Sequence, residues 1–359
     1  MQQLDIIGFD LAKMVFQVHG VDESGAVAVQ QRLKRSQVLP WFAAQKPCLV
    51  GMEACATAHH WARRIRKLGH DVRLLPPSYV KPYVRGQKND RADAAAICEA
   101  VSRPSMRFAP IKTPDQQAVQ TLHRSRRLLV RQRIQITNAL RGHLAEFGMV
   151  FPGRAAGVGK ALRALPRLTD ADMPATARRG LLCLTTQLQS TANAIKALDR
   201  QLLGWHRMQE VSRRLATIPG IGVVTATALA AALGDGHSFR SGREFAARLG
   251  LVPRQNSSGG KERLGRISKR GDDYLRQLLV VTATLQFTGK RRRTAPGGAW
   301  IEQLRQRKHA RVAAVAMANK LARIAWAIVM KGGSYRVTAR PGVPDGIGPC
   351  GSASGLTEI

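Results

Sequence analysis

Short apolar runs, each ended by a polar turn, fill the first hundred residues of the chain. Residues 4–10 (LDIIGFD), 15–20 and 26–30 read as three strands joined by tight turns, so we expect an antiparallel meander. Alternating helices and strands are predicted next, over residues 37–44, 48–53, 57–68, 71–75 and 90–101. The order of three strands, helix, strand, helix, strand and helix predicts an RNase H-like α/β layer.

Long helices are predicted from residue 114 to about residue 206. Two series of apolar residues recur every seven positions, as in coiled coils: Leu122, Leu129 and Ile136, then Leu181, Leu188, Ile195 and Leu202. A helical hairpin within one chain and a seam between subunits explain these stripes equally well. The Gly- and Pro-containing stretch 148–159 would link the two helices.

The opposite face of the first long helix is expected to be basic. Its arginines are Arg124, Arg126, Arg127, Arg131, Arg133 and Arg141. A solvated face normally mixes charges of both signs, so this composition favours contact with a phosphate backbone. Arg124, Arg127 and Arg131 are the candidate contact residues.

Four parts are expected along the chain. An α/β domain would occupy residues 1–113, a helical coiled-coil region 114–210, and a mostly helical domain 211–335. The last segment, 336–359, is rich in Gly, Pro and Ser and is predicted to be a disordered tail.

The charge of the chain points to a polyanionic partner. Lys and Arg number 57 against 23 Asp and Glu, which gives a formal net charge of +34. An excess this large favours nucleic acid over simple solubility. No signal peptide is recognisable, and the longest apolar stretch, near residues 223–233, is too short to cross a bilayer, so we expect no membrane contact. Five scattered cysteines without a CxxC motif fit a reducing cytoplasm.

Four of the scarce acids fall where a metal site would need them. Asp10 and Glu53 end strands that would be neighbours in the predicted layer, and Asp90 and Asp93 share one face at the start of a helix. Carboxylates suit Mg²⁺ or Mn²⁺, and such ions assist phosphoryl transfer. The alternative is that Asp90 is a helix N-cap and Asp93 a first-turn acid favoured by the helix dipole. The four together favour a metal site.

Two glycine-containing segments in the C-terminal half are candidates for phosphate contact. Residues 218–222 (IPGIG) precede an apolar helix and have the form of a helix-hairpin-helix turn, in which Gly220 and Gly222 let backbone N–H groups approach DNA phosphates; the alternative is an ordinary turn between packed helices. The second segment places Ser257 and Ser258 among basic side chains. The candidate phosphate ligands there are Arg254, Lys261, Arg263, Arg266 and Lys269.

From the residues alone, this serine loop is better interpreted as a phosphate-binding loop than as the home of a nucleophile. A serine hydroxyl needs a base or strong stabilisation of charge at the phosphate to attack it. The cations supply stabilisation, but no histidine is close in sequence.

Five ordered motifs carry a resemblance to a known family: GFDLAK (8–13), GMEACATAHHWAR (51–63), KNDRADAAAICEA (88–100), IPGIG and GLVPRQNSSGGKERLGRISKRGD (250–272). The chain resembles the DEDD-type transposases of bacterial insertion sequences, a family of bridge-RNA-guided serine recombinases. The resemblance covers all but the tail. It implies a RuvC-like N-terminal domain, a coiled-coil middle and a C-terminal transposase domain.

The resemblance also implies roles for residues. Its acidic tetrad falls on Asp10, Glu53, Asp90 and Asp93, and its catalytic serine matches Ser258 better than Ser257. Ser258 would then form a phosphoserine intermediate with element-end and target DNA, and a noncoding bridge RNA would select the sites. A homo-oligomer, dimer or tetramer, in the bacterial cytoplasm with the nucleoid is expected. The alternatives are a Mg²⁺-dependent structure-specific nuclease of the RuvC type and a nonenzymatic nucleic-acid-binding protein.

Overall fold

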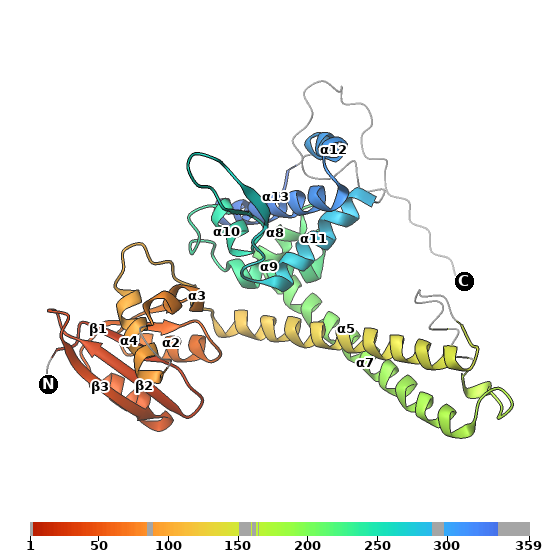
Figure 1. Ribbon diagram of the computed structural model, residues 1–359, viewed down its shortest axis with the longest axis horizontal. Coiled ribbons are helices and arrows are strands. Elements are labelled where there is room, and N and C mark those ends of the chain that lie inside the picture. Colours follow the sequence, from red (N-terminus) through yellow and green to blue (C-terminus); the bar gives the residue numbers. More distant parts are fainter. Residues whose placement is uncertain are drawn as a thin grey trace. The chain divides into compact units, whose positions relative to one another are not determined.

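The computed structural model describes residues 3–84, 89–150, 159, 163, 165–288 and 298–336 (Figure 1). The chain divides into two compact units. The first consists of residues 1–209 and 226–241, and the second of residues 210–225 and 242–359. Most of the predicted link at 148–159 and nearly all of the predicted tail lie outside the described residues. The four-part division of the chain stays a prediction.

The first unit is built on a mixed sheet of five strands in the order β3-β2-β1-β4-β5. The strands are β1 (Ile6–Asp10), β2 (Val15–Val21), β3 (Val27–Lys34), β4 (Leu49–Glu53) and β5 (Asp71–Leu75). The first three are antiparallel, whereas β4 is parallel to β1 and β5 to β4. The predicted meander is therefore confirmed, and so is the pairing of β1 with β4. Strand β3 is longer than predicted because the buried Leu33 continues its alternating pattern.

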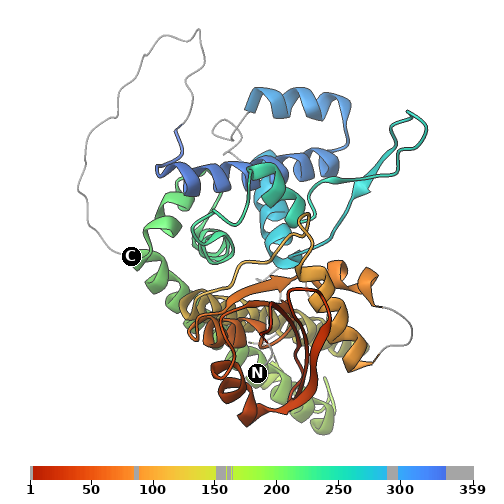
Figure 2. The ribbon, with the colours of Figure 1, turned by 90° about the vertical axis from the view of Figure 1, so that its left-hand side faces the viewer.

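Helices cover both faces of this sheet (Figures 1 and 2). On one face lie α1 (Val38–Ala43) and α2 (Ala58–Arg66), which bury Phe42, Trp61 and Ile65 against the odd-numbered residues of β1 and the even-numbered residues of β4. On the other face lies α4 (Asp90–Val101), which packs against both strands. Because side chains alternate along a strand, β1 and β4 turn Asp10 and Glu53 toward the face that α4 covers.

Two glycines let α4 approach the sheet closely. A Cβ added at Gly8 of β1 would lie 2.1 Å from the carbonyl oxygen of Ala94 and 2.6 Å from the backbone nitrogen of Cys98. At Gly51 of β4 it would lie 2.8 Å from the Cβ of Val101. Any larger residue at these positions would push the helix outward. This close packing sets the distance between the start of α4 and the ends of the strands.

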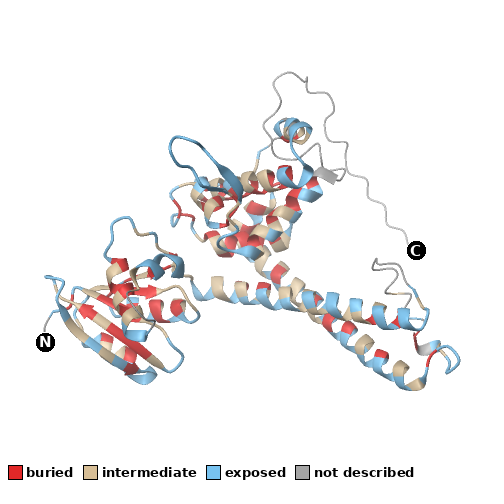
Figure 3. Cartoon of the chain, in the orientation of Figure 1, coloured by how far each residue is buried: buried red, intermediate tan, exposed pale blue. Residues whose placement is uncertain are grey.

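Two long helices, α5 (Pro114–Glu146) and α7 (Ala175–Met208), pack along each other as an antiparallel pair. Near its start α5 meets the end of α7, where the Trp205 indole donates to the Asp115 carboxylate. Farther along, Leu140 and the α7 heptad residues Leu181 and Leu188 share one core cluster. The α7 series is buried, whereas Leu122, Leu129 and Ile136 of α5 are half-buried (red and tan in Figure 3). Whether they also form a seam between subunits is not tested.

Arg126 corrects one detail of the predicted basic face. Its guanidinium donates to Asp199 of α7 at 2.5 Å, so it lies at the seam and not on the outside. The reason is spacing: Arg126 lies four residues after Leu122 and three before Leu129, on the same side of the helix as that stripe.

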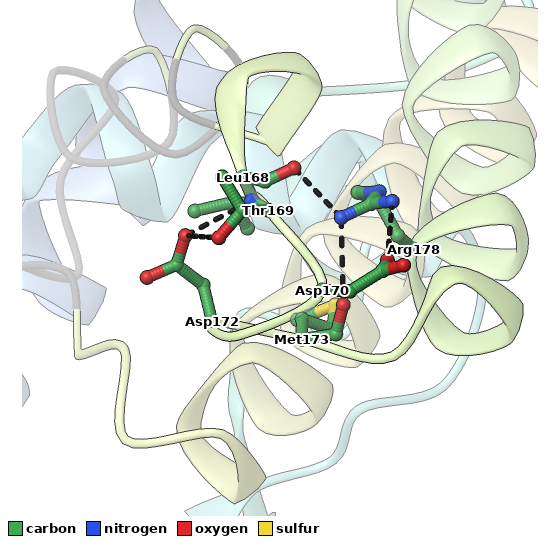
Figure 4. Close-up of polar contacts among 6 residues, drawn as sticks. All are labelled: Leu168, Thr169, Asp170, Asp172, Met173 and Arg178. Carbon is green, nitrogen blue, oxygen red and sulfur yellow. Dashed lines mark hydrogen bonds and ion pairs between the residues drawn. The ribbon is translucent and has the colours of Figure 1, made fainter.

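Arg178, in the first turns of α7, binds the segment that precedes this helix, as Figure 4 shows. The Arg178 guanidinium donates to the carbonyl oxygens of Leu168 and Met173, at 2.7 and 3.4 Å, and to the Asp170 carboxylate at 2.8 Å. Met173 is fully buried in the hairpin cluster. The segment before α7 is therefore ordered by the helix that follows it.

The second unit is mostly helical, as predicted, with one hairpin that was not. Its helices are α8 (Glu210–Ala216), the start of α9 (Val223–Leu233), α10 (Gly242–Arg248), α11 (Asp273–Thr288), α12 (Gly298–Arg307) and α13 (Ala310–Lys331). The hairpin is β6 (Pro253–Gln255) paired with β7 (Leu264–Ile267).

Helix α13 is the one helix among the described residues that is long and apolar enough to cross a membrane by length and composition. The charged residues Lys320 and Arg323 lie within its apolar sequence. One side of the helix, which includes Met317 and Leu321, is buried in the core of its unit. Its partners there are α10 and α11. This burial is that of a core helix.

Candidate metal centre and serine hairpin

Three carboxylates meet where β1 ends and α4 begins. Carboxylate oxygens of Asp10, Asp90 and Asp93 all lie within 4.8 Å of one another. Asp10 comes from the sheet, and the other two come from the first turn of α4. The side-chain oxygen of Asn89 accepts from the N–H of Ala92 at 2.8 Å and so serves as the N-cap. The suggestion that Asp90 is that cap is therefore wrong, and its carboxylate is not used for capping.

Glu53 lies beside this group but not within it. It ends β4, next to β1, and its side chain shares the α4 face with Asp10. Its oxygens are not among those that meet within 4.8 Å, yet its charge acts on Asp10. Of the four acids singled out from the sequence, three are brought together and the fourth is placed at their edge.

The pKa of Asp10 is raised by burial and by the neighbouring acids. Burial, first, and the charges of Asp93, Asp90 and Glu53, in that order, raise the pKa of the Asp10 carboxyl to about 6; a backbone hydrogen bond from Leu11 opposes the change. Like charges at close range destabilise each other without a counter-ion. A set of carboxylate oxygens suits a hard divalent cation such as Mg²⁺ or Mn²⁺. The residues present therefore fit a divalent metal.

The serine loop is the tip of the β6–β7 hairpin, in which every residue but Ile267 is exposed (Figure 3). Lys261 N–H donates to the carbonyl oxygen of Ser258 at 3.1 Å, and Gly259 and Gly260 between them have φ of 56° and 74°. Two successive positive φ angles are typical of a type I′ turn, which suits a two-residue hairpin. The Gly-Gly pair is the sequence signal that could have revealed this hairpin.

The two serines have different surroundings. The Ser257 hydroxyl accepts from the backbone N–H of Arg263 at 3.1 Å and so helps to hold the hairpin closed. The Ser258 side chain is exposed at the first position of the turn, and its hydroxyl has no hydrogen bond within the described part of the chain. Ser258 is therefore the hydroxyl that a ligand can reach without breaking the hairpin.

The basic residues singled out around the serines are all exposed on or beside this hairpin. They are Arg254, Lys261, Arg263, Arg266 and Lys269. Across the described residues none of them forms an ion pair with a carboxylate. Their charges are thus available to an anionic ligand.

The base of the hairpin is held by groups that the sequence did not reveal. The Arg276 guanidinium of α11 donates to the carbonyl oxygens of Leu249 and Arg270, at 2.7 and 3.3 Å. Gly250 and Gly271 both have positive φ, and a Cβ at either would lie within 2.3 Å of a backbone oxygen. The base is therefore closely packed, whereas the tip is open.

Two family descriptions match the chain. One, "Transposase", covers residues 7–149 and so includes all four acids, and the other, "Transposase IS116/IS110/IS902 family", covers residues 212–295 and includes the serine hairpin. A probable family 20 transposase of Pseudomonas aeruginosa is 49% identical over 93% of this chain and 99% of its own length. The chain belongs to the IS116/IS110/IS902 family of transposases.

Other members of the family are nearly as similar. The transposase for insertion sequence element IS1328 of Yersinia enterocolitica is 43% identical over 92% of this chain and 98% of its own length. The transposase for IS1111A of Coxiella burnetii is 40% identical over 94% of this chain and 93% of its own length. The protein is therefore an enzyme that cleaves and joins DNA, with element ends and target DNA as partners.

The glycine turn of this transposase lies between α8 and α9, as expected from the sequence. Gly220 has φ of 84°, and the Gln286 side chain of α11 donates to the Pro219 carbonyl oxygen and fills the space beside Gly220, where a Cβ would lie 2.6 Å from its nitrogen. Gly222 has no atom within 4 Å of such a Cβ. Gly220 thus allows the Gln286 side chain to pack against the turn, whereas the space beside Gly222 is open. Contact of this turn with DNA stays a prediction.

The three arginines of α5 proposed to contact nucleic acid lie on the side away from the seam. Arg124 and Arg131 are exposed, and Arg127 is half-buried. They follow one another at three and four residues, so they share one face of the helix. This arrangement permits the predicted contact without testing it.

Proposed function

We propose that this transposase exchanges DNA strands through a phosphoserine intermediate on Ser258, assisted by a divalent metal at Asp10, Glu53, Asp90 and Asp93. The observation that carries the proposal is the Ser258 hydroxyl, which is exposed at the tip of a cationic hairpin and forms no hydrogen bond with the described residues. The same chain also brings the carboxylates of Asp10, Asp90 and Asp93 together. In the resemblance stated above, the acids belong to a RuvC-like, RNase H-like domain. The strand order and the position of Asp10 support that fold.

The chemical step is a transesterification. The Ser258 oxygen would attack a DNA phosphorus, lose its proton, and form a serine–phosphate ester while the bond to one sugar oxygen breaks and that oxygen takes up a proton. A sugar hydroxyl of the partner strand would then attack the same phosphorus and release the serine. Because each step replaces one ester by another, no water is consumed and the strands are rejoined.

The hairpin cations would stabilise the charge that develops on the phosphate. Lys261, Arg263 and Arg266 are exposed within a few residues of Ser258 and form no ion pairs in the described parts of the chain. When bound, a divalent cation supplies further neutralisation of charge at the phosphate. We propose that a homo-oligomer bound to DNA assembles the complete site.

We further propose that an element-encoded bridge RNA selects the DNA sites. Base pairing would then read the sequence, and the protein would need to bind only backbone and shape. The net charge of +34 and the exposed Arg124 and Arg131 of α5 support this role. The test is whether strand exchange requires the noncoding RNA transcribed from the flank of the element.

The phosphoserine step is tested with the full chain, Mg²⁺, element-end DNA and the flanking noncoding RNA. We expect a protein–DNA adduct that survives denaturation and disappears in Ser258→Ala, with a loss of at least about 10³-fold, as expected when a nucleophile is removed. Ser257→Ala is the matched control. It should keep the adduct at a reduced rate, because it loses only the bond to the Arg263 N–H. An adduct that persists in Ser258→Ala and is lost in Ser257→Ala would reverse the assignment.

A hydrolytic, RuvC-type nuclease is the second candidate. It is favoured by the fact that Asp10, Asp90 and Asp93 meet within the first unit without any residue of the serine hairpin. Such an enzyme would nick DNA with water as nucleophile. Nicking that survives Ser258→Ala but not Asp10→Ala, without any adduct, would support it over the phosphoserine mechanism.

A further inference from the structure

The outer side of α2 carries only positive charge. Its inner side buries Ala58, Trp61, Ala62 and Ile65 against the sheet. The other side presents His60, Arg63, Arg64 and Arg66, followed by Lys67 at the helix end. The helix contains no acidic residue. The three arginines lie in the last turn of the helix, where the dipole favours basic residues.

The basic side of α2 continues onto α5. Two α2 side chains hold the same backbone unit just before α5: Arg63 donates to the Lys112 carbonyl oxygen at 2.5 Å, and His59 accepts from the Lys112 N–H at 3.3 Å. Arg124 of α5 lies close enough to act on His59, whose pKa falls to about 4, mainly through burial and then through Lys112, Arg63 and Arg124. Arg124 therefore lies near the α2 side chains that hold Lys112.

The cations on this side lack counter-ions. Arg63, Arg64, Arg66, Lys67 and Arg124 form no ion pair among the residues that the structure describes.

Two other arginines of the same α/β domain, Arg73 and Arg103, are paired, whereas its exposed Arg32, Arg35 and Arg91 form no ion pair among the described residues. Arg73 meets Asp71 at 2.8 Å, and Arg103 meets Glu99 at 2.7 Å. The domain thus has acids available for pairing, but it places none of them here. Like charges so close together repel one another, and a polyanion relieves that repulsion.

We propose that the α2 basic face, defined as Arg64, Lys67 and Arg124, binds the phosphate backbone of duplex DNA. Long cationic side chains reach phosphates but carry no sequence information. The aromatic residue of α2, Trp61, is buried and cannot stack on a base, which argues against a single-stranded ligand.

This inference rests on DNA being the substrate of the family and not on the phosphoserine step. Binding is therefore measured with the full chain in EDTA and in the Ser258→Ala background, so that no adduct can form. The probe is a duplex of unrelated sequence, and the readout is the slope of log K against log salt. A failure here leaves the adduct result untouched, and the absence of an adduct leaves this binding result untouched.

The test variant is Arg64→Gln with Lys67→Gln; both side chains are exposed and form no hydrogen bond with the described residues. Losing two phosphate contacts should reduce the salt slope by about 1.8, at about 0.9 for each contact, and weaken binding at least about 10-fold at low salt. Arg73→Gln with Arg103→Gln is the matched control, because it removes the same charge from the same domain at paired sites.

Two outcomes would overturn the proposal. In the first, the control changes the salt slope as much as the test variant does, which would make the effect one of net charge alone. In the second, duplex binding is unchanged while binding of the element's noncoding RNA falls, which would assign the face to RNA. Circular dichroism melting of both variants checks that each is folded.

Discussion

Replacing Gly8 by alanine is expected to abolish metal-dependent activity and to destabilise the α/β domain by about 2 to 4 kcal/mol, the scale of overpacking a core against rigid backbone. The added Cβ would lie 2.1 Å from the Ala94 carbonyl oxygen and 2.6 Å from the Cys98 nitrogen, both backbone atoms of α4. The helix must therefore move outward, and Asp90 and Asp93 move with it, away from Asp10. Thermal unfolding and the DNA adduct assay measure the two effects.

Gly142→Ala is the control for this substitution. Gly142 lies within α5, and a Cβ there would meet nothing within 4 Å. Alanine in an exposed helix is about 0.5 to 1 kcal/mol more favourable than glycine, so this variant should be slightly stabilised and fully active. If Gly8→Ala kept wild-type stability and activity, the close packing of α4 on β1 would not be what positions the acids.

The position of the acids was partly predictable from the sequence and partly not. Strand alternation and the parallel pairing of β1 with β4 place Asp10 and Glu53 on one face at one edge, and the pattern of apolar residues carries that information. The distances depend on how closely α4 packs. Gly8 is visible in the sequence, but the backbone atoms of α4 that lie opposite it are not.

Local polar detail was the least predictable level. Asn89, not Asp90, caps α4, because an Asn one residue earlier offers its side-chain oxygen to the N–H of Ala92. Arg126 pairs across the helical seam, since the acid that attracts it, Asp199, is 73 residues away. The serine hairpin was recoverable, since its Gly-Gly turn is a local signal. Contacts between residues distant in sequence therefore account for most of what the chain did not reveal.

Removing the Asp10 charge should abolish activity and yet stabilise the metal-free protein at neutral pH. The folded-state pKa of Asp10 is about 6, above its ordinary value of 3.8. A raised pKa means that Asp10 stabilises the fold below pH 3.8, and that this contribution is lost as the pH rises through 6. Asp10→Asn cannot ionise at this position and so avoids the loss. Its free energy of unfolding at pH 7 in EDTA should therefore exceed that of wild type by about 1 to 2 kcal/mol, a value discounted for partial solvent exposure.

Thermal unfolding in EDTA across this pH window, repeated with Mg²⁺, distinguishes a metal centre from a structural cluster of acids. Wild type should lose stability between about pH 4 and pH 7 in EDTA and regain it with Mg²⁺, because binding to the folded state alone is stabilising. Asp10→Asn should show neither change. Asp5→Asn, an exposed acid just before β1, should follow wild type in both. If Mg²⁺ stabilised Asp10→Asn as strongly as wild type, Asp10 would not be a ligand; if Mg²⁺ stabilised neither protein, the carboxylates would form a structural cluster and not a metal centre.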